Sequence, residues 1–127
     1  MTGKEYLEQA ERINRLIEQK EQELKTLDSA SIHDERLSEV RAEIAYELEN
    51  LLIKRYEVFR QIQGLSDINH IDVLYRRYMQ SEDMKHIASE MRCSVSSVYH
   101  IHAAAVREFG KRYRDELKPL INGLMLH

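Results

Sequence analysis

The sequence predicts an all-α protein, and three observations lead to that expectation. The chain has 127 residues with only one Pro and four Gly, so few positions interrupt a helix. Charged residues make up 32% of the chain, and the apolar residues recur at helical rather than alternating spacing. The length allows one compact domain, or a small domain with an elongated appendage, and leaves no room for a second large core.

A first long helix is expected from Lys4 to Leu27. Its apolar residues form two series with a seven-residue period, Tyr6, Ile13 and Leu27, and Ala10, Ile17 and Leu24. This spacing is typical of a coiled-coil seam, which Lys20 interrupts and which Leu7 and Leu16 flank. A helix with such a seam needs a partner helix.

A polar turn over residues 28–34 leads into a second long helix that runs to Gln63. Ser31 is the expected N-cap, Asp34 and Glu35 lie near the positive end of the helix, and Gly64 is the expected C′ residue. The apolar stripe comprises Leu37, Val40, Ile44, Leu48, Leu51, Leu52, Val58, Phe59 and Ile62. The two helices should form an antiparallel hairpin. Because the stripe is wider than one partner needs, it either mediates self-association or packs on the C-terminal part of the chain.

After Gly64 the chain continues in shorter helices that are typical of a small domain. Ser66 or Asp67 caps a helix whose inward residues are Ile68, Ile71, Leu74, Tyr78 and Met79. A polar break over residues 80–83 follows. We therefore expect a helical hairpin over residues 1–64 that oligomerises, a small domain over residues 65–113, and an apolar tail over residues 114–127. Pro119 should break the last helix, and the tail should pack on this chain or on a neighbouring copy.

The stretch from Ile87 to Ile101 matches the spacing of a helix-turn-helix. Ala88 is the small residue that a close crossing of two helices needs, and the inward positions hold Ile87, Met91, Cys93, Val98 and Ile101. Ser94 is the expected N-cap of the second helix. Arg92 stands where Gly commonly provides a left-handed backbone, so a modest strain is expected there. An ordinary pair of core helices is the alternative explanation of this spacing.

Charge is distributed unevenly along the chain. Residues 1–65 hold 10 Lys/Arg and 14 Asp/Glu, residues 66–83 hold 2 and 4, and residues 84–127 hold 7 and 4. The overall net charge of −3 therefore conceals a segment of +3 that includes the helix-turn-helix spacing. A net negative chain of this kind can still bind nucleic acid through its basic segment.

Four motifs resemble the C-terminal, promoter-recognising region of sigma factors. They are Ile71-Asp-Val-Leu-Tyr-Arg-Arg-Tyr78, Ile87-Ala88, Ser94-Val-Ser-Ser-Val98 and Ile101-His-Ala-Ala-Ala105. From about Lys4 to Phe109 the chain also resembles a family of short phage and mobile-element proteins that join such a region to an N-terminal helical hairpin. The resemblance implies a DNA-binding transcriptional regulator of the phage late-activator type.

The second helix of a helix-turn-helix presents its outward residues to the major groove of DNA. The expected base-contacting residues are Val95, Ser96, Tyr99, His100 and Ala103. The expected phosphate-contacting residues are Arg77, Lys85, Arg92, Ser94, Ser97, Arg107, Lys111 and Arg112. Because no Arg or Lys occurs between Val95 and Val106, one copy should bind double-stranded DNA weakly. We expect a homodimer, or help from RNA polymerase, to raise the affinity.

Other kinds of chemistry find little support in the sequence. His100 and His102 point to different sides of a helix and cannot chelate one metal together, so no metal or other cofactor is expected. No catalytic constellation is evident, and we do not expect an enzyme. No apolar run approaches the roughly 20 residues that span a bilayer, and the N-terminus lacks the apolar core of a signal peptide. We therefore expect a cytoplasmic protein that does not contact a membrane.

Two alternative functions stay open. A small terminase subunit for DNA packaging also combines a helix-turn-helix with helical oligomerisation elements, and it would assemble as a closed ring. A sigma-like module could instead contact RNA polymerase or a sigma antagonist without binding DNA by itself. The sequence does not distinguish activation from repression, and it does not specify the DNA site.

Overall fold

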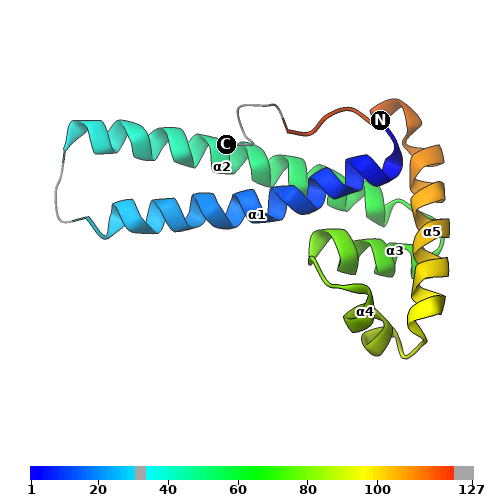
Figure 1. Cartoon of the computed structure of the whole chain (residues 1–127). Coiled ribbons are helices and arrows are strands. Elements are labelled where there is room, and N and C mark those ends of the chain that lie inside the picture. The colour runs from blue at the N-terminus through cyan, green and yellow to red at the C-terminus, as the bar shows by residue number, and fades with distance from the viewer. Residues whose placement is uncertain (31–33, 122–127) are drawn as a thin grey trace.

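The computed structural model describes residues 1–30 and 34–121, and all secondary structure in this part of the chain is helical (Figure 1). The elements are α1 (Gly3–Asp28), α2 (Glu35–Gln63), α3 (Ile68–Leu74), the π-helical turn η1 (Tyr75–Met79), α4 (Met84–Met91), α5 (Val95–Arg112) and the 3-10 turn η2 (Arg114–Glu116). The prediction of an all-α fold is confirmed, as is the end of the second long helix at Gln63.

Helices α1 and α2 lie side by side as an antiparallel hairpin, and its far end projects beyond the other helices (Figure 1). Helix α5 crosses the near end of this hairpin, where α1 begins and α2 ends (Figure 1). Helix α3 lies between the hairpin and α5, and α4 lies farther from the hairpin, where it packs on α5 and η1 (Figure 1). The molecule is therefore an elongated arm that carries a small helical head.

Each α-helix begins at a polar residue whose side chain accepts a hydrogen bond from a free backbone N–H group. These N-caps are Thr2, Asp34, Asp67, Asp83 and Ser94. Asp67 and Ser94 agree with the expected caps. Ser31, the expected cap of the second helix, lies outside the described residues, and Asp34 accepts the N–H of Arg36 at 2.9 Å instead.

The seam predicted for the first helix is confirmed. Tyr6, Ala10, Ile13 and Ile17 are buried, while Leu24 and Leu27 at the projecting end are half-buried. Lys20, the interruption in the seam, bonds to Glu47 of α2 at 2.7 Å, and this contact raises the pKa of the lysine. The charged residue thus links the two helices of the arm where no third element covers them.

The main hydrophobic core joins the near half of the hairpin to the head. Its buried members include Leu7 and Ile13 of α1, Leu51, Val58 and Ile62 of α2, Leu74, Tyr78 and Met79 from α3 and η1, and Ala105 and Phe109 of α5. The last part of the α2 stripe therefore packs on the helices that follow α2 in the chain. This packing is one of the two explanations that the sequence allows for the width of the stripe.

Three apolar residues that were expected to face inward are exposed. Ile68 is 78% exposed because it is the first residue of α3, and Leu65 occupies the neighbouring place in the core. Val40 is exposed on the projecting part of the arm, where α1 alone packs against α2. Leu52 is exposed beside the buried Leu51, at the edge of the packed face of α2.

The start of the apolar tail packs on its own hairpin. Leu120 and Ile121 belong to the main core. The N–H of Leu120 donates to the Gln9 side chain at 2.7 Å, and the Lys54 ammonium donates to the Leu120 carbonyl at 2.5 Å. Helix α5 already ends at Arg112, well before Pro119, so the proline does not terminate it. Residues 122–127 lie outside the described residues.

Two glycines are required by close packing rather than by backbone conformation. Gly64 ends α2 with φ −79°, not in the left-handed region expected of a C′ glycine, and a Cβ there would collide with the Tyr113 hydroxyl. A Cβ on Gly3 would lie 3.1 Å from the Cα of Gly110 and 3.3 Å from the Val106 carbonyl oxygen. The backbones of α1 and α5 therefore cross in direct contact.

Gly3→Ala should destabilise the fold by about 1–3 kcal/mol, because the added methyl group meets the α5 backbone, which cannot rotate away. Gly110→Ala is the matched control. A Cβ on Gly110 would lie 3.8 Å from the Gly3 nitrogen, an ordinary contact, and alanine favours a helix interior by roughly 0.5–1 kcal/mol. Urea unfolding of both variants measures the difference. Equal stability of the two variants would contradict the close crossing.

Candidate nucleic-acid interface

A second, smaller core fixes α4 against α5. Val73, Ile87, Ala88 and Val98 are buried in it, and the residues packed around them are Met84, Met91, Cys93 and Ile101. All the inward positions predicted for the helix-turn-helix therefore contribute to this core. Ala88 is only 4% exposed, which agrees with the need for a small residue where the two helices approach.

The turn between the two helices has the expected backbone. Arg92 adopts the left-handed conformation, with φ 56° and ψ 46°, at a position where glycine is more common. The N–H of Cys93 donates to the Ala88 carbonyl at 3.1 Å and closes the end of α4. The Ser94 hydroxyl then accepts the N–H of Ser97 at 3.1 Å and begins α5. The turn thus sets the direction of α5 by local hydrogen bonds.

One face of α5 is exposed to solvent. We call it the outer α5 face, and it consists of Val95, Ser96, Tyr99, His100 and Ala103, all of which are exposed. The opposite side of the same helix holds the fully buried residues Val98, Ala105 and Phe109. The five residues expected to contact bases therefore share one solvent-facing surface at the N-terminal end of α5.

Most of the expected phosphate-contacting cations surround this face. Lys85 on α4, Arg92 in the turn, and Arg107 and Lys111 on α5 are exposed. Within residues 1–30 and 34–121, none of these four forms an ion pair. Arg107 and Lys111 extend the row of Ser96, His100 and Ala103 along α5, since successive members are three or four positions apart. Arg112 is also exposed and lies over the Tyr113 ring at 5.9 Å.

Three of the expected phosphate contacts are engaged within the protein. The guanidinium of Arg77 pairs with Glu11 of α1 at 2.8 Å and lies 5.5 Å from the centre of the Tyr78 ring. The hydroxyls of Ser94 and Ser97 are exposed but bond to each other at 2.8 Å. Arg77 is therefore oriented toward α1 rather than toward the outer α5 face.

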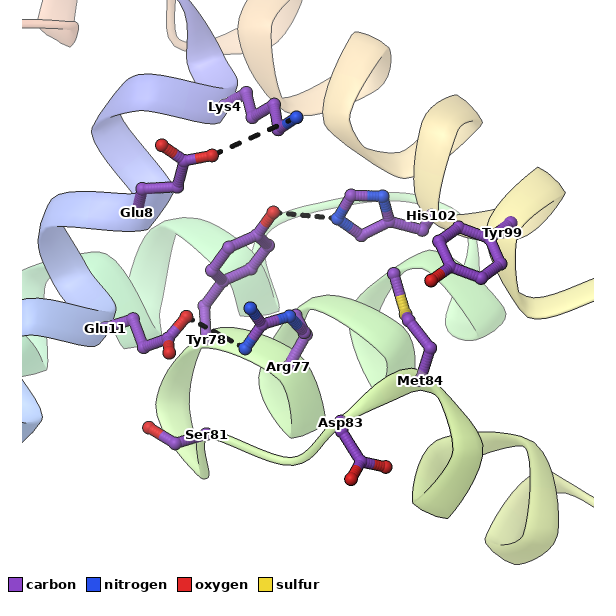
Figure 2. Close-up of a pocket in the computed structure, with 10 residues that line it drawn as sticks. All are labelled: Lys4, Glu8, Glu11, Arg77, Tyr78, Ser81, Asp83, Met84, Tyr99 and His102. Atoms are coloured by element: carbon purple, nitrogen blue, oxygen red, sulfur yellow. Dashed lines mark hydrogen bonds and ion pairs between the residues drawn. The ribbon is translucent and has the colours of Figure 1, made fainter. Parts of the chain in front are cut away.

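An open cleft of about 580 Å³ lies between α1, η1 and α5, beside the outer α5 face (Figure 2). Its lining residues are Lys4, Glu8, Glu11, Arg77, Tyr78, Ser81, Asp83, Met84, Tyr99 and His102. The two cations are paired internally, Arg77 with Glu11 at 2.8 Å and Lys4 with Glu8 at 4.0 Å. With three carboxylates against two cations, the cleft repels anions and does not form a phosphate site.

A buried hydrogen bond at the back of this cleft orients α5. The Tyr78 hydroxyl lies 2.7 Å from Nε2 of His102 (Figure 2). Burial raises the pKa of Tyr78 to about 12, and burial, with Arg77 and Lys4 nearby, lowers the pKa of His102. Both groups are therefore neutral at pH 7, and the tautomer of the imidazole decides whether the tyrosine hydroxyl donates or accepts this hydrogen bond. His102 thus faces inward while His100 faces solvent, as their spacing predicts.

A second polar cluster ties α5 to the start of α3. Glu108 of α5 accepts the backbone N–H of Ser66 at 3.0 Å and the Ser66 hydroxyl at 2.8 Å. Its other oxygen lies 2.6 Å from Nδ1 of His70. The backbone N–H of Ser66, the His70 ring and the Ser66 hydroxyl together lower the pKa of Glu108 to about 2. A folded protein therefore keeps this carboxylate ionised far below neutral pH.

A third cluster joins the hairpin to the end of η1. Arg55 of α2 donates to the Asn14 side chain at 2.8 Å and to the Met79 carbonyl at 2.9 Å. Asn14 of α1 in turn donates to the Tyr78 carbonyl at 2.9 Å. The last carbonyl groups of a helix have no hydrogen-bond partner within the helix. Arg55 and Asn14 provide the missing donors for Met79 and Tyr78. The hairpin thus holds the helix that precedes the helix-turn-helix.

No spacing in the sequence indicated these three clusters, because their members lie far apart along the chain. Comparison with known protein families, with curated proteins and with solved structures finds no match. Among the described residues, no helix is long and apolar enough to cross a membrane, and no group of three or more His, Cys, Asp or Glu side chains could hold a metal ion. The function proposed below rests on the geometry of α4, α5 and their surroundings.

The Glu108 cluster predicts a specific dependence of stability on pH. The pKa of Glu108 is lowered in the folded state, so its contribution is present above the unfolded pKa and is lost as the pH falls toward about 2. Glu108→Gln should be less stable than the wild type at pH 7 and should lose less stability between about pH 5 and pH 2.

Urea unfolding at several pH values tests this expectation, with Glu39→Gln as the control. Glu39 is an exposed carboxylate on α2 that forms no ion pair within the described part of the chain. Parallel pH profiles for wild type and Glu108→Gln would show that the cluster contributes nothing to folding.

Proposed function

We propose that the protein is a sequence-specific transcriptional regulator that binds double-stranded DNA in the cytoplasm and reads the major groove with the outer α5 face. The observation that carries this proposal is the exposure of all five residues of that face on the second helix of a helix-turn-helix. A helix needs a free, polar face at its N-terminal end to enter the groove. The resemblance to sigma factors and to phage regulators supports the same function.

The outer α5 face offers both polar and apolar contacts to base edges. Ser96 and His100 lie one helical turn apart, and each can form hydrogen bonds with acceptors or donors in the major groove. Val95 and Ala103 can pack against the methyl group of thymine. Tyr99 stands at the rim of the cleft and is suited to reach the sugar–phosphate backbone. This combination favours a site that contains A·T pairs.

The exposed cations around this face supply the attraction to phosphate. Arg92 precedes the N-terminal end of α5, Arg107 and Lys111 continue the face toward its C-terminus, and Lys85 is exposed on the neighbouring helix α4. The hairpin, in contrast, has 10 Lys/Arg and 14 Asp/Glu within residues 1–65. Like charges repel, so the acidic arm favours an orientation in which the head faces the DNA and the arm points away.

A single head of this kind binds weakly, because no arginine stands on the outer α5 face to form the bidentate contact with guanine. Two heads on adjacent half-sites raise the affinity without any new contact to the bases. We therefore propose that the protein acts as a homodimer, with RNA polymerase as a further partner at promoters. Dimeric readers of this class bind half-sites about one helical turn apart, or a multiple of it.

Replacing Ser96 and His100 by alanine should weaken binding to the preferred DNA site while the fold stays intact. Both side chains are exposed and carry no contact within the fold, so only base contacts are lost. The expected loss of discrimination is about 1–3 kcal/mol. Footprinting on the DNA next to the gene identifies the site, and fluorescence anisotropy measures the affinity of both proteins for it. An unchanged affinity would show that another surface reads the DNA.

Arg107→Ala should weaken binding to all DNA sequences alike, because a phosphate contact carries no sequence information. The slope of log K against log salt should become shallower by about 0.9 for the one phosphate lost. Lys25→Ala is the matched control, since this exposed cation lies in the last turn of α1, far along the arm. A slope that changes equally in both variants would contradict the placement of DNA on α5.

A further inference from the structure

Helix α2 carries a second seam on the face opposite the main core. Its members are Tyr46, Glu49, Ile53, Tyr56, Arg60 and Gln63, and we call this set the outer α2 seam. The positions are separated alternately by three and four residues, which is the spacing of the a and d positions of a coiled coil. The buried residues Leu51, Val58 and Ile62 lie on the other side of the helix.

Unusually large apolar side chains on this seam face solvent. Tyr46 is 67% exposed, Ile53 is 51% exposed and Tyr56 is 59% exposed. A helix of a monomer that packs by one face normally carries polar residues on the opposite face. Leu51, Val58 and Ile62 pack into the core that α1 shares, so the seam lies on the side of α2 turned away from this core. These three residues therefore have the exposure expected of an interface.

We propose that the outer α2 seam is a dimer interface, in which α2 of one copy packs antiparallel against α2 of a second copy. In this register Ile53 faces Tyr56 of the second copy, and Tyr56 faces Ile53 of the second copy. The next layer on either side places Glu49 against Arg60 of the second copy. The outermost layer places Tyr46 against Gln63 of the second copy.

The register follows from twofold symmetry, under which every contact between two residues occurs twice with the roles exchanged. All six members of the seam then face another member. Each residue at a heptad position a faces a residue at position d of the second copy. Ile53 and Tyr56 meet at the centre of the interface, and the charged layers flank them. This order of an apolar centre with polar ends is the usual anatomy of a protein interface.

The charges specify the antiparallel direction. In a parallel pairing Glu49 would face Glu49 of the second copy, and Arg60 would face Arg60 of the second copy, so both layers would repel. In the antiparallel register both layers become attractive ion pairs. Neither Glu49 nor Arg60 forms an ion pair within the described residues, so both are available to a second copy.

The same geometry places the two heads at opposite ends of the interface. Gln63 lies level with Tyr46 of the second copy, so the C-terminal ends of the two α2 helices are about 25 Å apart at a rise of 1.5 Å per residue. Each α5 lies beyond its own end of α2 (Figure 1). The pairing of the two α2 helices does not depend on DNA binding. It would bring together the two heads that the proposed function requires.

Charge reversal tests the pairing in the absence of DNA, by sedimentation equilibrium of the full chain. The wild type is expected to be a dimer at tens of micromolar. Glu49→Arg alone and Arg60→Glu alone should each raise the dimer dissociation constant by at least about tenfold, because a like-charged layer replaces an ion pair. The double variant with both reversals should recover the dimer, since it restores both layers with the signs exchanged. Glu43→Arg is the control, because this exposed residue on α2 lies outside the seam.

Ile53→Asp provides a second, independent measurement, since it places a carboxylate at the centre of the interface and should yield a folded monomer by circular dichroism and sedimentation. A monomeric wild type, or a double variant that stays as weak as the single ones, overturns the proposal. A chain that dimerises only after removal of residues 122–127 would show that its own tail occupies the seam, and this outcome also overturns it. DNA binding is measured separately, so its failure leaves this result unaffected.

Discussion

The burial of one side of α5 against α1 is the constraint on which the remaining structure depends. Phe109 lies in the main core with its ring centre 5.8 Å from that of Tyr6, and the backbones of Gly3 and Gly110 meet next to this contact. Because α5 is held along this side, it can neither rotate nor slide. The face that remains exposed is therefore determined by what the hairpin buries, and it is the outer α5 face, the surface that we propose binds DNA.

Polar clusters fix the orientation of α5, which apolar packing alone does not determine. Apolar contacts alone are non-directional, whereas hydrogen bonds require specific distances and angles. Tyr78 and His102 link η1 to α5, and Glu108 links α5 to the start of α3. Each cluster uses a residue of α5, so each restrains the same helix. The direction of α5, and with it the position of the outer α5 face, is therefore set by hydrogen bonds within the fold.

The two ends of the molecule differ in charge and in packing. The head has two cores and exposed cations, while the projecting arm is acidic and contains only half-buried seam residues. Helix α2 belongs to both parts, with a buried seam that faces α1 and an exposed seam that faces away. In the proposed dimer, α2 of each copy would therefore connect its own head to the interface through one continuous helix.

The sequence by itself determined the helices, the N-caps Asp67 and Ser94, the seam of α1 and the inward residues of the helix-turn-helix. These features depend on periodicity and on hydrogen bonds between residues a few positions apart, which a sequence displays directly. Only the tertiary structure decided that Arg77 turns to Glu11, that Ile68 and Leu52 face solvent, and that Tyr78 meets His102. Those outcomes depend on which surfaces far apart in the chain come together. The hydrophobic effect is non-directional, so the local apolar pattern shows which faces are buried but not which faces meet.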